Sequence, residues 1–230
     1  LPECAIVNNI EFDHADIYEN LAAIKKSFGH MIRLVPGNGL TLINGDDQNC
    51  LDVFASQGHS PMKRVGFGED CEARISDVDY RVESTAFSLE GECYEILLNG
   101  EFNVRNAAMA VTAARFADVS PAAIREALAS FSGVRRRQEV RGVTSRNITV
   151  VDDFGHHPTA IREALAGMRR RFAGARLWAV FEPRSNTTRR NVFQDALPEA
   201  LGHADGVCLA AVARADSLAE NERLDTDLLM

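Results

Sequence analysis

The chain has 230 residues, of which 46% are hydrophobic and 25% charged, a composition typical of a globular protein with one large domain or two modest ones. No apolar run approaches the roughly 20 residues that a membrane helix needs, and the opening LPECAIVNN lacks the basic flank of a signal peptide. Five scattered cysteines without a C-x-x-C pair disfavour a disulfide framework and a zinc site and favour a reducing cytoplasm, while a formal net charge of −8 disfavours general nucleic-acid binding.

The first part of the chain alternates strand and helix patterns. Residues 5–7 are short and apolar and end at two asparagines, as a buried parallel strand ends at a loop. Apolar residues then recur at helical spacing over residues 17–30, the run GLTLING is typical of another strand, and residues 46–56 are typical of another helix. This alternation predicts an α/β sheet.

The pattern changes over residues 65–100. Short β-rich runs separated by glycine and acidic turns occur there, namely RVGFG, ARISDVDYRV, STAFSLEG and CYEILLNG. We expect these runs to add an antiparallel extension to the sheet. Helical periodicity returns in residues 103–116 and 121–131, where Pro121 suits the first turn of a helix.

A polar, basic connector, SGVRRRQEVRG, follows these helices, and we place a domain boundary there, near Gly133. Residues 1–133 carry 10 Lys and Arg against 20 Asp and Glu, whereas residues 134–230 carry 15 against 13. The different charge balance supports two domains with these bounds. The arginines of the second domain suit an anionic ligand such as a nucleotide, and a solvated surface is the alternative for any single one of them.

The second domain also alternates strands and helices. Residues 138–144 and 148–151 flank a turn-like SRN, and Pro158 opens a helix that runs to about residue 172. We expect ARLWAVFEP to form a buried strand, residues 191–201 a helix, and DGVCLAAV the next strand. This order predicts a Rossmann-like open sheet.

Two loops of the second domain carry polar side chains at predicted strand ends. In open α/β sheets, ligands bind beyond the C-terminal ends of the strands. DDFGHHP and EPRSNTTRR each follow a predicted strand, so we expect both loops at one edge of the sheet. That edge would present Asp153, His156, His157, Arg184, Asn186 and Arg189.

The segment NNIEFDHAD places Asn9, Asp13, His14 and Asp16 just after the first strand. Imidazole and carboxylate groups are metal ligands, and His14 is a candidate to complete the shell of a Mg²⁺ held mostly elsewhere. The alternative is that Asp13 or Asp16 caps the helix that follows.

Two further motifs have polar groups suited to a nucleotide. In NGEFNVRNAAMA, Asn103 and Asn106 are three residues apart and share a helix face, and their amides match the donor and acceptor of adenine. Helix capping by Asn103 is the alternative. In the connector, Arg137 suits a phosphate, and a solvated linker is the alternative.

The motifs NNIEFDHAD, NGEFNVRNAAMA, GVRRRQEVRG, DDFGHHPTAI and EPRSNTTRR occur in this order along the chain. This succession resembles the Mur ligase family, the ATP-dependent amide-forming enzymes of peptidoglycan synthesis. Family members have an N-terminal UDP-sugar domain, a central ATPase domain and a Rossmann-like C-terminal domain. The resemblance implies that residues 1–133 are the later part of the ATPase domain, with a mixed sheet, and that residues 134–230 are an incomplete C-terminal domain.

The phosphate loop of the family, G-x-x-G-K-[ST], does not occur in this sequence. The chain also begins without Met, in an apolar run, and stops at LDTDLLM, which indicates a piece of a longer protein. The N–H groups and the lysine of such a loop hold the nucleotide phosphates. We therefore expect the chain by itself to be inactive.

The resemblance implies nucleotide and metal roles for single residues. His14 matches the histidine of a D-H-x-D pattern that binds Mg²⁺. Asn103 and Asn106 match asparagines that contact adenine in the family. Phe102 stands where the family usually has a histidine, so a contact made by that histidine in the family is not expected here. Arg137 matches an arginine that reaches ribose or phosphate.

The resemblance also implies roles at the two loops of the second domain. Asp153 matches the acidic residue that holds the ribose, and His156 lies where a histidine approaches the reacting end of the substrates. Arg184 matches a residue that contacts the amino substrate, so that His156 and Arg184 are the candidate catalytic residues. His157, Ser185 and Asn186 are further candidates for substrate binding.

The implied reaction joins UDP-N-acetylmuramate to the tripeptide L-alanyl-γ-D-glutamyl-meso-diaminopimelate in peptidoglycan recycling, with ATP and Mg²⁺. EPRSNTTRR favours this tripeptide over L-alanine, the amino substrate of another family member, which remains the alternative. A noncatalytic nucleotide-binding module is a second alternative. A metal-dependent hydrolase built on His14, His156 and His157 is a third, disfavoured because these residues lack known ligand spacing.

Overall fold

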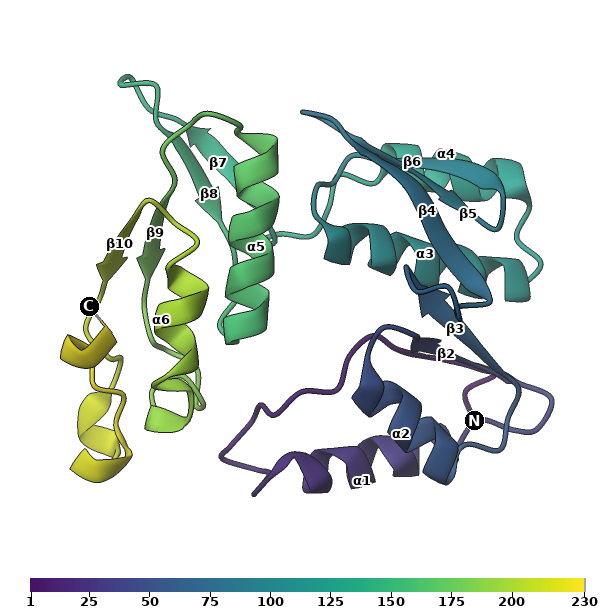
Figure 1. Ribbon diagram of the computed structural model, residues 1–230, viewed down its shortest axis with the longest axis horizontal. Coiled ribbons are helices and arrows are strands. Elements are labelled where there is room, and N and C mark those ends of the chain that lie inside the picture. Colours follow the sequence, from purple (N-terminus) through teal and green to yellow (C-terminus); the bar gives the residue numbers. More distant parts are fainter. Residues whose placement is uncertain (230) are drawn as a thin grey trace. The chain divides into compact units, whose positions relative to one another are not determined.

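A computed structural model describes residues 1–229 of the chain (Figure 1). The chain divides into two compact units. Unit 1 comprises Leu1–Phe12 and Tyr18–Phe131, and unit 2 comprises Asp13–Ile17 together with the chain from Ser132 onward. Among residues 1–229, none of the helices combines the length and the hydropathy that crossing a bilayer requires.

Unit 1 is built on a six-stranded sheet in the order β1-β2-β3-β4-β5-β6. The strands are β1 (Cys4–Val7), β2 (Leu40–Asn44), β3 (Met62–Gly66), β4 (Ala73–Tyr80), β5 (Thr85–Leu89) and β6 (Glu92–Ile96). Strands β1 to β4 pair in parallel, and β4 to β6 pair antiparallel. The mixed sheet with an antiparallel extension is therefore confirmed. The run RVGFG was expected in the antiparallel part, but it falls largely in β3, which lies between two parallel neighbours.

Four helices belong to unit 1, and local capping sets where three of them begin. The helices are α1 (Leu21–Ile32), α2 (Gln48–Gln57), α3 (Glu101–Phe116) and α4 (Pro121–Ser130). Asn20, Asp47 and Ser120 accept hydrogen bonds from backbone N–H groups three residues on, at 3.0, 3.0 and 3.3 Å. The helix expected from residue 17 begins at Leu21, because Asn20 caps it and Asp13–Ile17 belongs to unit 2. The proposed capping of this helix by Asp13 or Asp16 is wrong.

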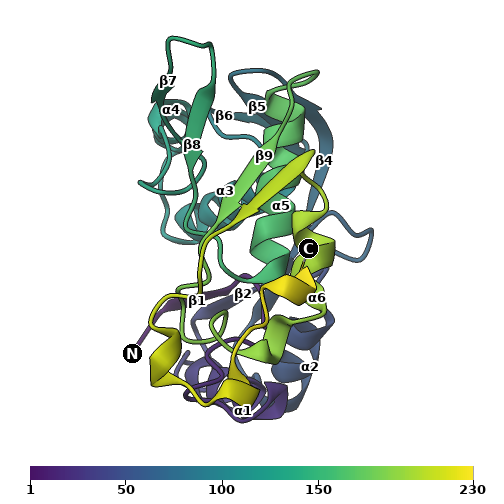
Figure 2. The same ribbon diagram turned by 90° about the vertical axis from the view of Figure 1, so that its left-hand side faces the viewer.

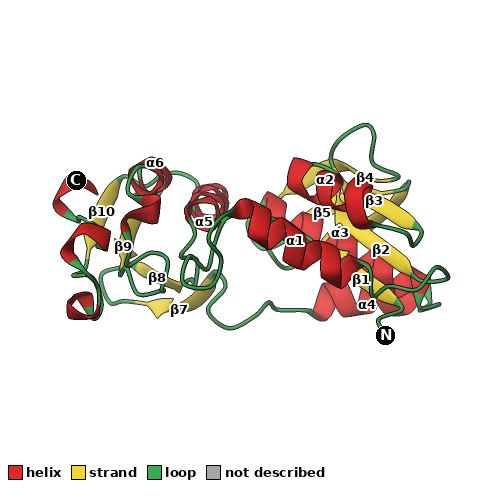
Figure 3. Ribbon diagram, turned by 90° about the horizontal axis from the view of Figure 1, so that it is seen from below, coloured by secondary structure: helices red, strands yellow, loops and turns green. Residues whose placement is uncertain are grey.

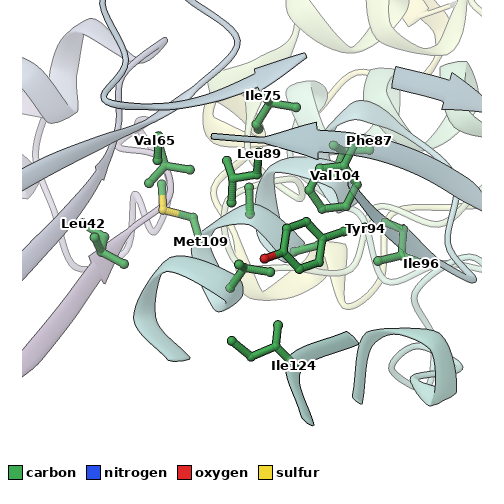
Figure 4. Packing of buried hydrophobic residues seen from close by; sticks show 14 residues of the cluster. Leu42, Val65, Ile75, Phe87, Leu89, Tyr94, Ile96, Val104, Met109 and Ile124 are labelled. Carbon is green, nitrogen blue, oxygen red and sulfur yellow. The ribbon is translucent and has the colours of Figure 1, made fainter. Parts of the chain in front are cut away.

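In unit 1, strand β2 is buried on both faces of the sheet. The neighbouring residues Leu42 and Ile43 of β2 are both fully buried, and they lie in different hydrophobic clusters. The cluster of Leu42 also contains residues of α3 and α4, and the cluster of Ile43 contains residues of α1 and α2. In Figure 3, α2 and α4 accordingly lie on opposite sides of the strands. Figure 4 shows the larger cluster, in which the Phe87 and Tyr94 rings stack at 5.7 Å.

A carboxylate links β3 to the loop before β4. Glu72 accepts from the backbone N–H of Arg64 at 2.8 Å and from its guanidinium at 2.7 Å. Hydrogen bonding to the Arg64 side chain, the largest cause, lowers the pKa of Glu72 to about 2. The charged form of this carboxylate therefore stabilises the folded unit.

We expect the Glu72→Gln variant to be less stable than the parent by about 1 kcal/mol at pH 7, because the Glu72 side chain is partly exposed and its ion pair is screened. Because the pKa of Glu72 in the folded protein is lower than its ordinary value of 4.5, the ionised carboxylate stabilises the folded state at pH values above 4.5. This stabilisation is lost as the pH falls toward about 2. Urea unfolding of both proteins between pH 7 and pH 3 measures this difference. A difference that stays constant over this range would contradict the assignment, and Glu69→Gln, at an 89% exposed side chain, is the control.

Unit 2 contains two separate pairs of strands among its described residues. Strands β7 (Glu139–Val143) and β8 (Thr149–Asp152) are antiparallel, whereas β9 (Trp178–Phe181) and β10 (Gly206–Leu209) are parallel and lie side by side in Figure 2. The helices are α5 (Pro158–Arg171) and α6 (Ala196–Leu201), with 3-10 turns at η1 (Asn191–Phe193), η2 (Ala215–Ser217), η3 (Glu220–Glu222) and η4 (Asp227–Leu229). The order β8-α5-β9-α6-β10 is the alternation expected from the sequence.

The prediction that ARLWAVFEP is a buried strand is wrong for one face of β9. Ala179 and Phe181 pack against α5 and α6 in the core of unit 2. Trp178 and Val180 point the other way and are 54% and 80% exposed. Successive side chains of a strand alternate between faces, and among residues 1–229 the helices cover only one face of this pair.

Candidate active site

The turn that follows β8 is organised by the carboxylate of Asp153. Its Oδ2 accepts from the Gln138 N–H at 2.9 Å, and its Oδ1 accepts from the Gly155 N–H at 2.6 Å. A Cβ on residue 155 would lie 2.9 Å from this Oδ1, so the turn requires glycine there. Both oxygens of Asp153 already serve the turn, and each keeps further lone-pair capacity for a ligand such as a ribose hydroxyl.

The two histidines of this turn have different surroundings. His157 is the N-cap residue of α5: its Nδ1 accepts from the Thr159 N–H at 3.2 Å, and its ring meets the Phe193 ring edge-on at 4.8 Å. The Nδ1 of His156 lies 3.3 Å from the Phe154 carbonyl oxygen, and its Nε2 lies 3.3 Å from Oδ2 of Asp13. His157 therefore starts a helix, while His156 faces a carboxylate.

The loop that follows β9 contains one exposed arginine, Arg184, followed by a hydrogen-bonded turn. Arg184 has a side chain that is 76% exposed, with its Nη1 3.9 Å from Glu182. The Ser185 hydroxyl accepts from the Thr188 N–H at 3.1 Å and lies 2.7 Å from the Thr188 hydroxyl. Asn186 accepts from Arg189 at 2.9 Å and donates to Asp16 at 2.8 Å. Arg184 is thus exposed to solvent, whereas Ser185 and Asn186 already bond within the protein.

The segment Asp13–Ile17 lies against these two loops within unit 2. Burial by itself would raise the pKa of Asp13, but hydrogen bonds from the His14 N–H and the Thr187 hydroxyl, together with the imidazoles of His156 and His14, lower it. The Nε2 of His14 lies 4.0 Å from Oδ2 of Asp13, and the His14 side chain is 65% exposed. The Asp13 carboxylate therefore lies near both imidazoles.

The two predicted adenine-binding asparagines lie on α3 of unit 1, where they make different hydrogen bonds. Asn103 donates to the Asn99 carbonyl at 2.7 Å and does not cap the helix, whose N-cap residue is Gly100 at φ 103°. The capping alternative for Asn103 is therefore wrong. Asn106 is exposed, and its Oδ1 accepts from the Asn8 amide at 3.1 Å. This bond joins the end of β1 to the first turns of α3.

The basic connector packs on an aromatic ring. The guanidinium groups of Arg136 and Arg137 lie 4.9 and 5.5 Å from the centre of the Phe154 ring, and the Arg136 carbonyl accepts from the Phe154 N–H at 2.7 Å. A depression of about 490 Å³ opens beside it, lined by Arg135, Arg136, Glu139, Arg141 and Asp152. The connector is therefore an ordered part of unit 2, and Arg137 is held close to the turn that contains Asp153.

Comparison with known proteins decides the family. The Mur ligase middle domain matches residues 1–114, and the domain described as Mur ligase, glutamate ligase domain matches residues 135–226. The chain belongs to the Mur ligase family.

Three relatives indicate which Mur ligases the chain is similar to. It is 42% identical over 212 residues to the UDP-N-acetylmuramate–L-alanyl-γ-D-glutamyl-meso-2,6-diaminoheptandioate ligase of Escherichia coli K12, covering 90% of this chain and 46% of the relative. It is 34% identical to the UDP-N-acetylmuramate–L-alanine ligase of Hydrogenovibrio crunogenus, covering 92% and 47%. The crystal structure of a murein peptide ligase from Psychrobacter arcticus 273-4 superposes with a TM-score of 0.62 at 32% identity, covering 90% and 43%. The chain spans about half the length of the curated relatives it matches.

The described residues of this Mur ligase chain do not form a metal-binding cluster by themselves. Among residues 1–229, no three His, Cys, Asp or Glu side chains are grouped so as to hold a metal ion. The metal-hydrolase alternative therefore gains no support from His14, His156 and His157. Mg²⁺ prefers several oxygen ligands, and His14 offers one exposed nitrogen. Within the described part of the chain, His14 is therefore a candidate ligand without a complete set of donors around it.

Sequence reasoning missed the parts that Thr187 and Asp46 play in this Mur ligase. Thr187 is 2% exposed and accepts from the Ala15 N–H at 3.3 Å. Asp46 accepts from the Phe67 and Gly68 N–H groups at 2.9 and 2.8 Å and pairs with Arg105 at 3.3 Å. Asp13, Asp16 and Thr187 stand in motifs that the sequence analysis singled out, and no role was assigned to Thr187, whereas Asp46 lies outside those motifs.

Proposed function

We propose that the full-length protein containing this chain is an ATP-dependent ligase that joins UDP-N-acetylmuramate to L-alanyl-γ-D-glutamyl-meso-diaminopimelate. The observation that carries the proposal is the 42% identity, over 90% of the chain, to a ligase named for this peptide, against 34% to a ligase named for L-alanine. In this proposal residues 1–133 are the later part of the ATP-binding domain, and residues 134–230 belong to the C-terminal domain. The free cysteines fit a cytoplasmic location.

The chemistry of such a ligase begins with a carboxylate, which is a poor electrophile. ATP converts it to an acyl phosphate by transfer of the γ-phosphoryl group, and ADP leaves. The amino group of the peptide then attacks the acyl carbon, a tetrahedral oxyanion forms, and its collapse yields the amide and phosphate while the amine loses a proton. Positioning the reactants accounts for much of the acceleration in reactions of this kind.

Within this reaction we propose that Asn103 and Asn106 bind adenine and that Asp153 and Arg137 bind the ribose and phosphates. The exposure of Asn106 and the remaining lone pairs of Asp153 support these roles. Mg²⁺ would accompany ATP, with His14 as its candidate ligand in this chain.

On the peptide side we propose that Arg184 contacts a carboxylate of the tripeptide. Its exposed guanidinium supports this role, because a planar guanidinium can bind a carboxylate through two parallel hydrogen bonds. His156 and Arg184 are the proposed catalytic residues, with His156 near the reacting end of the substrates. His157, Ser185 and Asn186 complete the proposed substrate side, although part of the hydrogen-bonding capacity of each serves the turns described above.

Phosphate release by the full-length protein tests the proposed function. With ATP, Mg²⁺ and UDP-N-acetylmuramate present, we expect kcat/KM to be at least about a hundredfold higher for the tripeptide than for L-alanine, since the peptide offers charged groups that L-alanine lacks. A preference for L-alanine would identify the other ligase activity, and nucleotide binding without turnover of either substrate would favour a noncatalytic module. The 230-residue chain by itself is the control, and we expect no turnover from it because it has no phosphate loop.

A further inference from the structure

The segment Asp13–Ile17 belongs to unit 2, although the residues on either side of it, Phe12 and Tyr18, belong to unit 1. Three of its residues contact the rest of unit 2. Asp13 faces His156 at 3.3 Å, the Ala15 N–H donates to the Thr187 hydroxyl at 3.3 Å, and Asp16 accepts from Asn186 at 2.8 Å. We call the five residues Asp13–Ile17 the docking segment. Its position is set by hydrogen bonds to the two loops that carry the candidate peptide-side residues.

A buried arginine determines how Asn186 faces the docking segment. Arg189 is 7% exposed, and one of its terminal nitrogens donates to the Ser217 hydroxyl at 3.0 Å. Its other terminal nitrogen donates to Oδ1 of Asn186 at 2.9 Å. Because an arginine can only donate, the amide oxygen of Asn186 has to face Arg189, and the amide nitrogen is left to donate to Asp16. The orientation of this amide thus follows from Arg189.

The Thr187 hydroxyl holds the docking segment at a second point. This buried hydroxyl accepts from the Ala15 N–H, and it also hydrogen-bonds to the Asp13 carboxylate. A hydroxyl has one donor and two acceptor positions, so one group can make both contacts. Removal of the hydroxyl would leave the Ala15 N–H without its acceptor and take one of the hydrogen-bond donors from the Asp13 carboxylate.

Between these anchors the backbone of His14 has a left-handed conformation, with φ at 54°. This region is disfavoured for a residue with a Cβ, and it persists where surrounding contacts determine the backbone. The contacts of Asp13, Ala15 and Asp16 lie on both sides of His14. They hold the turn while leaving the His14 imidazole largely exposed.

We propose that Thr187, Asn186 and Arg189 are positioning residues that dock Asp13–Ile17 and thereby place the His14 and His156 imidazoles about the Asp13 carboxylate. The docking stands on the contacts above, whereas its importance for turnover rests on the proposed ligase function. According to this proposal, Asn186, which is also a candidate for substrate binding, affects the reaction by holding the docking segment in place.

Hydrogen–deuterium exchange on the full-length protein tests the docking. In Thr187→Val, which keeps the size of the side chain but removes the hydroxyl, we expect the Ala15 amide to exchange at least about tenfold faster than in the parent. Thr187→Ser keeps the hydroxyl and is the matched control, with exchange expected near the parent rate. Unchanged exchange at Ala15 in Thr187→Val would overturn the proposal.

A second pair of variants addresses the other anchor without altering a buried residue. Asp16 is exposed, so Asp16→Ala removes the acceptor of the Asn186 amide with little risk to folding, and Asp16→Asn retains an acceptor. We expect faster exchange of the docking segment in Asp16→Ala and a return toward the parent rate in Asp16→Asn. Equal exchange in the two variants would overturn the role of the Asn186 contact.

Steady-state kinetics then test whether docking matters for turnover. We expect Thr187→Val to lower kcat about tenfold, with KM for ATP within about twofold of the parent and with kcat restored in Thr187→Ser. Faster exchange with unchanged kcat would overturn the functional part of the proposal and leave the docking intact. If the parent protein itself does not turn over, the proposed function fails, and the exchange results still decide the docking.

Discussion

Replacement of Phe87 by alanine is expected to lower the free energy of unfolding of unit 1 by about 3 to 5 kcal/mol. Phe87 is 1% exposed, and its ring stacks on Tyr94 within the larger hydrophobic cluster (Figure 4). The substitution removes the transfer free energy of a ring and leaves a cavity that the strands and helices around it fill only in part. Such a loss is a large fraction of the stability of a typical domain.

Denaturant unfolding of the full-length protein, followed by a probe within residues 18–131, measures this change. Phe87→Leu retains most of the apolar volume and should cost about 1 kcal/mol. Phe116→Ala is the control for loss of a partly exposed ring, because Phe116 is 39% exposed, and it should cost less than Phe87→Ala. A loss below about 1 kcal/mol for Phe87→Ala would contradict the assignment of this ring to the core.

Replacement of Arg184 by alanine is expected to reduce kcat/KM of the full-length protein for the tripeptide about a hundredfold. The expectation follows from the proposed charge-assisted contact with a carboxylate of the peptide, which contributes about 2 to 3 kcal/mol. The folded protein should be little affected, because the side chain is 76% exposed and lies 3.9 Å from its nearest carboxylate. Phosphate release at varied tripeptide concentration, together with thermal unfolding, separates these two effects.

The matched control for Arg184 is Arg162→Ala on α5. The Arg162 side chain is 43% exposed and lies 3.9 Å from Glu163. The Arg162→Ala substitution therefore also removes a surface charge, but outside the loop that contains Arg184. We expect kcat/KM for this variant to stay near the parent value. Arg184→Lys should recover only part of the loss, because an ammonium group does not reproduce the planar two-point contact. Equal activity of Arg184→Ala and the parent would exclude the proposed contact.

Capping and periodicity made most helices predictable from the sequence. Ser120 before Pro121 is a local signal for the start of α4, and α2, expected over residues 46–56 from its pattern, begins within two residues of the expected position. The first helix was placed four residues too early. Asn20 caps that helix, and residues 13–17 are held by unit 2, so tertiary contacts outweighed the apolar spacing.

The sequence motifs identified the candidate residues, but they did not predict which side chains surround those residues in the folded protein. His156 and His157 are adjacent in sequence, yet one faces Asp13 and the other caps α5 on Phe193. Ser185 and Asn186 were expected at the substrate and are bonded to Thr188, Arg189 and Asp16. Residues far apart in sequence supply several of these contacts, and the local pattern does not specify them.

By itself the sequence determined the alternation of strands and helices, the antiparallel extension of the first sheet and the family, because these depend on apolar spacing, capping residues and the order of short motifs. Only the tertiary structure decided that β3 pairs in parallel, that one face of β9 is exposed, and that Asp13–Ile17 lies against Thr187 and Asn186. The physical reason is that strand pairing, burial and side-chain hydrogen bonds depend on which distant residues meet. For Asp16 and Asn186 these partners are 170 positions apart along the chain.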